Sequence, residues 1–157
     1  MNILVFAKRV AATQEEELRI RDEGAAVDLS KVPFKINDWD NYSVEEAVRI
    51  VEKTGGTVTA ISIGDAESDE VLRRAIAMGA RDGFLVSSGE IFHDPGVRSR
   101  LIQNFIRKEN IPFDVIFTGV QSEDDQFGCV GGILGACLGL PYSSMVIGID
   151  AVEKDHM

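Results

Sequence analysis

Residues 118–132 are the part of this sequence best suited to hold a ligand. The stretch combines the adjacent acids Asp124 and Asp125 with Ser122 and four glycines. Glycine lets a ligand approach the backbone closely, and the helix expected to follow offers unpaired N–H groups and the positive end of its dipole. The pattern favours a phosphate cradle. The two acids could accept hydrogen bonds from a ribose or an amide, or could simply cap the helix.

The same residues suit other chemistries less well. Paired acids also suit acid–base catalysis or Mg²⁺ binding, but adjacent carboxylates in a polar loop are usually solvated or capping. Cys129 lies near a helix start, which could lower its thiol pKa, yet a small helix residue packed inside is the simpler interpretation. His93 and His156 have no metal-ligand spacing. We therefore expect no catalytic residue and no metal ligand.

The common signatures of nucleotide-dependent enzymes are absent. No G-x-G-x-x-G follows the first apolar run, and no G-x-x-x-x-G-K-[ST] occurs anywhere. No serine stands in a nucleophile elbow with His and Asp partners. The sequence thus predicts a nucleotide cradle without catalytic machinery, and so a protein that is not itself an enzyme.

The hydrophobic pattern predicts the elements that position this loop. Apolar or β-branched runs at 3–7, 57–63, 83–86, 113–118 and 143–149 indicate strands. Helical stripes begin near Asp40, after Asp65 or Ser68, at Val97 and at Val130. Within residues 11–36, Leu18–Ile20, a turn at 22–24 and Ala26–Leu29 indicate a small hairpin.

Strands that alternate with helices imply parallel pairing. We expect one α/β domain over residues 1–157: a three-layer, Rossmann-like open parallel sheet of about five strands, with helices on both faces and a hairpin excursion after the first strand. Ligands of such sheets bind beyond the carboxyl ends of the strands. By position alone, the candidate segments are residues 6–8, residues 63–64 and the 118–132 loop.

Composition narrows the function further. The chain has 157 residues and a formal net charge of -10, which disfavours nucleic acid and anionic lipid as partners. The eight-residue spacing of Cys129 and Cys137 is about 12 Å along one helix, too far for a disulfide. Because no leader or long apolar span is evident, we expect a cytoplasmic protein without membrane insertion.

Four segments, in order along the chain, resemble the β subunit of electron transfer flavoproteins. They are Ile3–Val10, with its Lys-Arg-Val ending; residues 34–47, with Ile-Asn before Val-Glu-Glu-Ala; residues 75–82, with Ala-Met-Gly-Ala; and the loop from Gly119 to Gly131. Four ordered matches are far more specific than any one of them.

This resemblance implies a heterodimer in which an α subunit holds most of a redox-active FAD and the β subunit covers one side. Dehydrogenases would be the electron donors, and the β site would hold AMP or a second FAD. Backbone around Phe6, Ala7, Lys8 and Ile63 would face the adenine, joined by the Asn37 side chain. The ribose and phosphate would be surrounded by Ser122, Asp125, Gly128, Cys129 and Val130.

Three positions depart from the family's usual pattern: Asp38 replaces Pro, Val120 replaces Lys and Cys129 replaces Gln. These changes leave AMP, FAD or another adenine nucleotide open as the ligand. An alternative is a stand-alone nucleotide sensor resembling universal stress proteins, whose usual Gly-x2-Gly-x9-Gly-Ser/Thr is matched by Gly128 and Gly131 but interrupted by Pro141. An enzyme resembling nucleotide α-hydrolases is a third possibility, disfavoured by the missing phosphate-loop signature.

Overall fold

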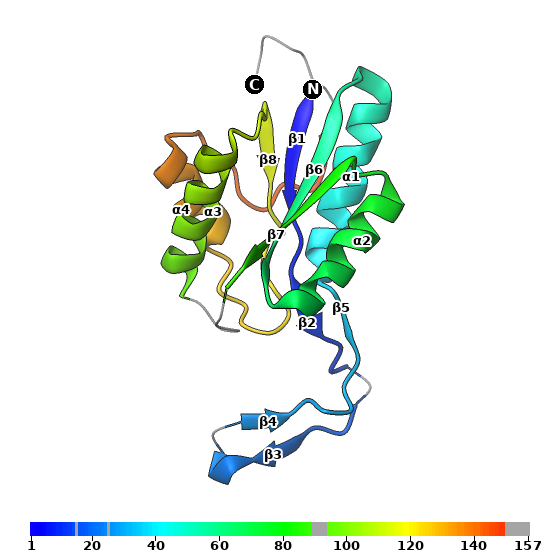
Figure 1. The fold of residues 1–157 in the computed structure, drawn as a ribbon, viewed down its shortest axis with the longest axis vertical. Coiled ribbons are helices and arrows are strands. Elements are labelled where there is room, and N and C mark those ends of the chain that lie inside the picture. The colour runs from blue at the N-terminus through cyan, green and yellow to red at the C-terminus, as the bar shows by residue number, and fades with distance from the viewer. Residues whose placement is uncertain (15, 25, 89–93, 150–157) are drawn as a thin grey trace.

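The computed structural model describes residues 1–14, 16–24, 26–88 and 94–149. Its centre is a four-stranded parallel sheet in the order β7-β6-β1-β8 (Figure 1). The strands are β1 (Asn2–Phe6), β6 (Thr57–Gly64), β7 (Asp82–Ser87) and β8 (Val115–Phe117). The predicted parallel α/β architecture is confirmed. Because β1 is central and parallel to both neighbours, the carboxyl ends of β1, β6 and β8 lie at one edge of the sheet.

Alternation along β1 places its side chains in two separate cores. Ile3 and Val5 pack with Val44 and Leu72 of the helices on one face, whereas Leu4 packs with Ile102 and other residues on the opposite face. Burial on both faces explains why β1 reads as a continuous apolar run. The result is the predicted three-layer arrangement.

Two helices cover each face of the sheet. One face carries α1 (Asp38–Thr54) and α2 (Asp69–Met78), the latter preceded by the short 3₁₀ turn η2 (Ala66–Ser68). The other carries α3 (Pro95–Glu109) and α4 (Val130–Leu138). Asp94 caps α3 by accepting hydrogen bonds from the Gly96 and Val97 amides. None of the helices in the described ranges has the length and apolar character required to cross a membrane.

The predicted hairpin is confirmed, and it stands apart from the sheet (Figure 1). Strands β3 (Arg19–Arg21) and β4 (Ala26–Asp28) pair antiparallel around the turn η1 (Asp22–Gly24). A second pair, β2 (Arg9–Ala11) with β5 (Phe34–Ile36), forms the base and was not predicted. Arg9 fixes this base: its guanidinium lies 3.8 Å from the centroid of the Phe34 ring and pairs with Glu67 and Glu70.

The expected strand at 143–149 does not form. Met145 has a positive φ of 53°, which an extended strand does not tolerate, and the side chain of Ile147 is fully exposed. The described sheet therefore ends at β8 and has four strands instead of about five. One smaller difference concerns a helix: α1 begins at Asp38, two residues before the expected start.

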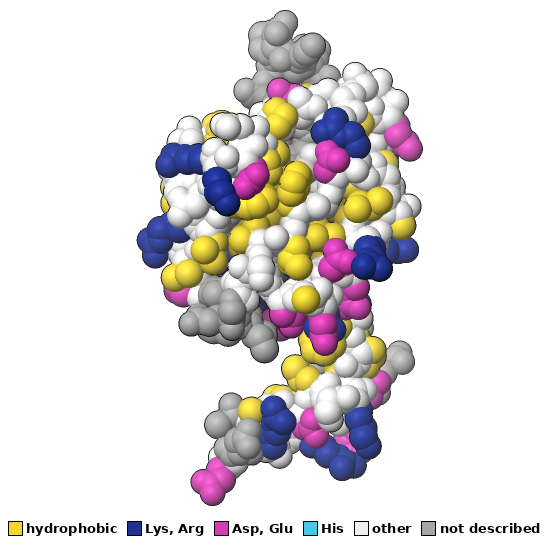
Figure 2. All heavy atoms as spheres, in the orientation of Figure 1, with side chains coloured by type: hydrophobic (Ala, Val, Ile, Leu, Met, Phe, Trp, Pro, Cys, Tyr) yellow, Lys and Arg dark blue, Asp and Glu magenta, His cyan; other side chains and the backbone are white. Residues whose placement is uncertain are grey.

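Apolar side chains also reach the surface over the β7 side of the sheet. Figure 2 shows them gathered between the two helical layers, and Phe84 of β7 is among the exposed large hydrophobic residues. Because β7 is an edge strand, its helices cover it less completely than they cover β1.

Candidate functional site

The carboxyl ends of β1, β6 and β8 surround one cavity. Backbone and side chains from Phe6 to Lys8, from Ile63 and from the loop after β8 line it, together with Arg98 of α3. All ten residues predicted from the sequence lie on this cavity: Phe6, Ala7, Lys8, Asn37, Ile63, Ser122, Asp125, Gly128, Cys129 and Val130. Segments more than a hundred residues apart in the chain thus meet where an open parallel sheet offers a binding crevice.

Asn37 holds the loop after β8 against the rest of the domain. Its side-chain amide donates to the Gln121 carbonyl oxygen at 2.9 Å and accepts from the Glu123 amide at 3.1 Å. The residue is 1% exposed. Both polar groups of this side chain therefore serve the loop, although the resemblance implied a contact between Asn37 and adenine.

Asp40, which sequence reasoning did not select, connects the ends of β1 and β8 beneath the cavity. Its carboxylate accepts from the Lys8 amide at 2.8 Å, and a Cβ added to Gly119 would lie only 2.1 Å from it. Gly119 must therefore remain glycine for the backbone to approach this closely. Burial raises the pKa of Asp40 to about 7, although hydrogen bonds from Lys8, Asn37 and Gly119 and the Lys8 charge oppose the rise.

A cluster of charges forms one wall of the cavity. The ammonium group of Lys8 donates to Ser122 Oγ at 3.0 Å and pairs with Asp124 at 2.5 Å and Asp125 at 2.8 Å. Arg98 reaches the same Asp125 carboxylate at 3.3 Å. Burial alone would raise the pKa of Asp125, but hydrogen bonds from Lys8, Ser122 and the Phe127 amide outweigh it and lower the pKa well below the usual range.

The start of α4 opens onto the same cavity. Cys129 occupies the N-cap position and makes no side-chain cap hydrogen bond. Asp125 instead accepts from the Phe127 amide within the loop, so the alternative that the paired acids cap α4 is wrong. Within residues 94–149, the N-cap side chain thus leaves the first-turn amides of α4 uncapped, as an anion-binding helix start requires. Cys129 and Cys137 both carry free thiols, and both are half-buried.

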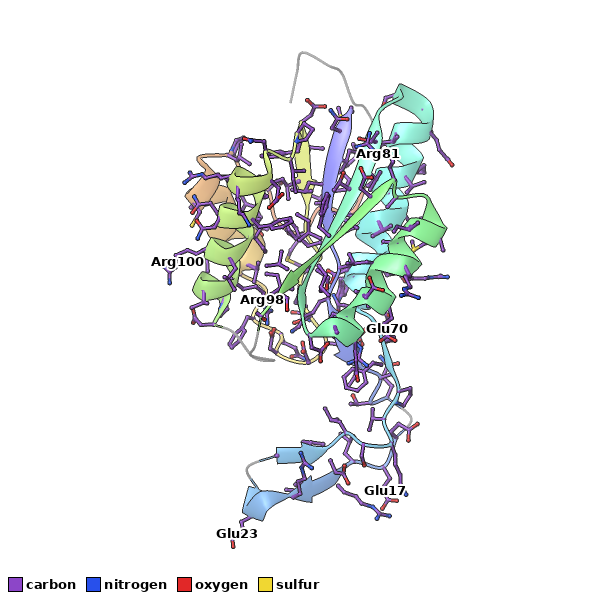
Figure 3. The ribbon with its side chains drawn as sticks, in the orientation of Figure 1. Glu17, Glu23, Glu70, Arg81, Arg98 and Arg100 are labelled. Atoms are coloured by element: carbon purple, nitrogen blue, oxygen red, sulfur yellow. The ribbon has the colours of Figure 1, made fainter. Side chains whose placement is uncertain are left out.

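Arg98 was also missed from the sequence. It sits in the first turn of α3, and Figure 3 shows it directed toward the interior of the domain while Arg100 of the same helix points away. Helical spacing gives a weak signal: Arg98 lies four residues before the buried Ile102, whereas Arg100 lies four residues before the exposed Asn104. Among the described residues no group of three or more His, Cys, Asp or Glu side chains is placed to hold a metal ion. His93 and His156 lie outside the described residues.

Fold and site together define a class. The domain is an open parallel α/β sheet with a crevice at its strand ends, lined by a glycine-rich loop, a helix start and two cations. Proteins of this class bind nucleotides and related anions at that place.

Comparison with known proteins identifies the family. The electron transfer flavoprotein domain matches residues 25–157, and the chain belongs to that family. It is 36% identical over 99% of its length to an electron transfer flavoprotein subunit beta from Methylophilus methylotrophus, and 32% identical over 99% to that from Bacillus subtilis. It is 32% identical over 88% of its length to Protein FixA of Azotobacter vinelandii.

The chain spans only part of these relatives. It covers 59% of the length of the first two and 52% of Protein FixA. The similarity to β subunits that the sequence motifs suggested is thus confirmed over nearly the whole of this chain.

Proposed function

We propose that this chain is the nucleotide-binding part of an electron transfer flavoprotein β subunit. In this role it binds AMP or FAD in the cavity at the strand ends and helps enclose the redox FAD of an α subunit. The complete assembly passes electrons between dehydrogenases and a downstream acceptor. The observation that carries the proposal is the convergence of ten residues, chosen from sequence, on one cavity of a chain in this family.

The chemistry of the cavity fits an adenine nucleotide. Phe6, Ile63 and Val130 supply apolar surface suited to a purine ring, and their neighbours supply backbone groups that recognise its polar edge. Ser122 and the amides from Gly128 onward suit a ribose and a phosphate. Lys8 and Arg98 line the cavity beside Ser122 and Asp125, and both are donors suited to a phosphate. Asn37 and Asp40 act beneath the ligand by holding the loop and the strand ends in place.

The flavin of the assembly would supply the electron-carrying chemistry. This chain's residues would bind the nucleotide, exclude water from one side of the flavin and set the electrostatic surroundings. In this proposal no side chain of the chain takes part in a covalent step, so the chain acts as a carrier subunit and not as an enzyme.

Co-purification tests this proposal. The chain is coexpressed with a candidate α subunit, and the complex is analysed for flavin absorbance and, after denaturation, for released nucleotide by chromatography. We expect FAD, accompanied by AMP or by a second equivalent of FAD. A well-folded complex that carries neither would contradict the proposal.

Titration of the isolated chain separates the proposal from the sensor alternative. AMP, ATP and FAD are titrated separately by calorimetry. Binding of AMP or FAD at one site per chain supports the β-subunit function. A strong preference for ATP, without any association with an α subunit, would favour a protein resembling universal stress proteins instead.

A further inference from the structure

One carboxylate oxygen is held between two cations at the cavity wall. Asp125 Oδ2 lies 2.8 Å from Lys8 Nζ and 3.3 Å from Arg98 Nη1. The Asp125 side chain is 8% exposed, whereas Lys8 and Arg98 are 22% and 14% exposed. The cations come from the end of β1 and from α3, so they approach the oxygen from separate elements.

This arrangement is the one that a phosphate oxygen adopts between basic side chains. Charge-assisted pairs of this kind are short and strong, and a carboxylate and a phosphate use the same donors. The second carboxylate oxygen of Asp125 accepts from Ser122 Oγ at 2.6 Å and from the Phe127 amide at 3.1 Å. The loop thus places its own anion beside both cations.

The positive and negative charges on this wall of the cavity cancel. Lys8 and Arg98 contribute two positive charges, and Asp124 and Asp125 contribute two negative ones, so the wall has no net charge to attract a nucleotide. Among the residues that the structure describes, Asp124 pairs with Lys8 and not with Arg98, and it is 43% exposed. Asp125 is the acid in contact with both cations, and its withdrawal would make them available together.

We propose that the Asp125 carboxylate occupies the position that a phosphate group of the bound nucleotide takes between Lys8 and Arg98, so that the two anions compete for the same cations. The inference rests on the proposed function and deepens it. It makes Arg98 and Lys8 the residues that distinguish phosphorylated adenosine from adenosine. Asp125 then weakens nucleotide binding instead of binding the ribose, because its carboxylate competes with the phosphate for Lys8 and Arg98.

The test compares AMP with adenosine, by calorimetry, on the full 157-residue chain. In Asp125→Asn we expect AMP to bind about tenfold tighter and adenosine to bind as in wild type. In Arg98→Gln we expect AMP to bind about tenfold more weakly, again without a change for adenosine. Arg100→Gln is the matched control on α3 and should change neither affinity, because that side chain points away from the cavity.

A second control separates competition from a general charge effect. Asp124→Asn removes one negative charge beside Lys8 but leaves Arg98 paired, so it should tighten AMP binding much less than Asp125→Asn. Equal gains from the two variants would overturn the inference. Weaker binding of both AMP and adenosine to Asp125→Asn would also overturn it, because that result describes a carboxylate that binds the ribose.

The variants still give a clear result if Asp125→Asn does not fold or if wild type binds no ligand. If Asp125→Asn does not fold, as judged by circular dichroism, the Arg98→Gln and Arg100→Gln pair still decides. Equal losses for AMP and adenosine in Arg98→Gln would overturn the inference. If wild type binds neither AMP nor adenosine nor FAD, the proposed function fails and the inference fails with it. If the chain binds AMP but the variants do not change the AMP and adenosine affinities as expected, the inference fails and the proposed function stands.

Discussion

Asp40 is the buried carboxylate on which the geometry of the cavity floor depends. It accepts the Lys8 amide at the end of β1 and lies against Gly119 at the end of β8. Burial of a carboxylate favours its neutral form, and the pKa of about 7 reflects the excess of this penalty over the hydrogen bonds that favour the charge. The contact between the two strand ends is therefore sensitive to protonation.

The raised pKa predicts how stability changes with pH. Between the unfolded-state value near 4 and the folded value near 7, the folded chain binds more protons at Asp40, so the free energy of unfolding falls as pH rises and levels off above pH 7. Asp40→Asn removes this contribution. We expect the difference in unfolding free energy between wild type and Asp40→Asn to shift by about 2 to 3 kcal/mol in the variant's favour from about pH 5 to about pH 8.

Urea unfolding at several pH values measures this difference. Glu45→Gln, an exposed acid on the same helix, is the control and should track wild type throughout. A constant difference between wild type and Asp40→Asn would show that burial does not raise the pKa of this group.

Removal of the Asn37 side chain should loosen the loop after β8. Asn37→Ala deletes two hydrogen bonds and leaves the Gln121 carbonyl and the Glu123 amide without these partners. We expect a loss of about 2 to 3 kcal/mol in unfolding free energy and faster hydrogen exchange at the Glu123 amide. Asn104→Ala, an exposed amide on α3, should cost less than about 0.5 kcal/mol. Similar hydrogen-exchange rates at the Glu123 amide in Asn37→Ala and Asn104→Ala would show that Asn37 does not hold the loop in place.

At the scale of elements, the hairpin differs from every other part of the fold. β3 and β4 pair with each other, and all three residues of β3 are exposed. Ile20 of β3 is exposed, and so is Leu18 just before the strand. A lone two-stranded hairpin is marginally stable, so β3 and β4 should open without unfolding the sheet. The base, β2 with β5, is by contrast fixed to the domain through Arg9.

Deletion of the hairpin should leave the domain folded. Residues 14–31 are replaced by an Asn-Gly turn between Thr13 and Val32, which preserves β2, β5 and the buried Val32. We expect Tm to change by no more than about 5 °C, because few stabilising contacts are lost. Thermal unfolding followed by circular dichroism checks this, and a collapse of the cooperative transition would show that the hairpin supports the core.

The elements most readily predicted were those with a strong pattern. Continuous apolar runs predicted β1 and β6, and helical stripes predicted the four helices, because burial of one face imposes the period. The prediction of a strand at 143–149 was wrong, because an apolar run does not reveal whether a neighbouring strand is available to pair with it. The β2–β5 pair was not predicted, because the contact between Arg9 and Phe34 joins residues that are far apart in the sequence.

The candidate site also contains residues that the sequence predicted and residues that it did not. Segments at strand ends were predictable because topology alone brings them together. Asp40 and Arg98 were not, since one required knowledge that Gly119 lies against α1 and the other that a particular face of α3 meets the loop. Helical spacing places both residues on the buried stripes of their helices, but it does not reveal the tertiary contacts that they make.

At the scale of the whole molecule, net charge and exposed apolar surface act against each other. The formal charge of -10 makes copies of the chain repel. Several apolar side chains after α4 are nevertheless exposed, including Met145 at 75% and Ile147 at 104%. Exposed apolar groups of this size promote association once repulsion weakens.

Salt should therefore promote self-association. At about 1 M salt the screening length falls to about 3 Å, and we expect light scattering after gel filtration to detect larger species than at low salt. Met145→Ser with Ile147→Ser should suppress these species, whereas Ile20→Ser, which removes an equally exposed group on the hairpin, should not. Suppression by Ile20→Ser alone would place the contact on the hairpin.

The separation of the hairpin from the sheet has an evolutionary consequence. Substitutions at β3 and β4 touch neither the strand ends that line the cavity nor the cores on the two faces of the sheet. Natural selection can therefore alter the projecting segment while the ligand crevice stays under its own constraints. Descendants of one ancestral domain could diverge there rapidly and still inherit an intact fold.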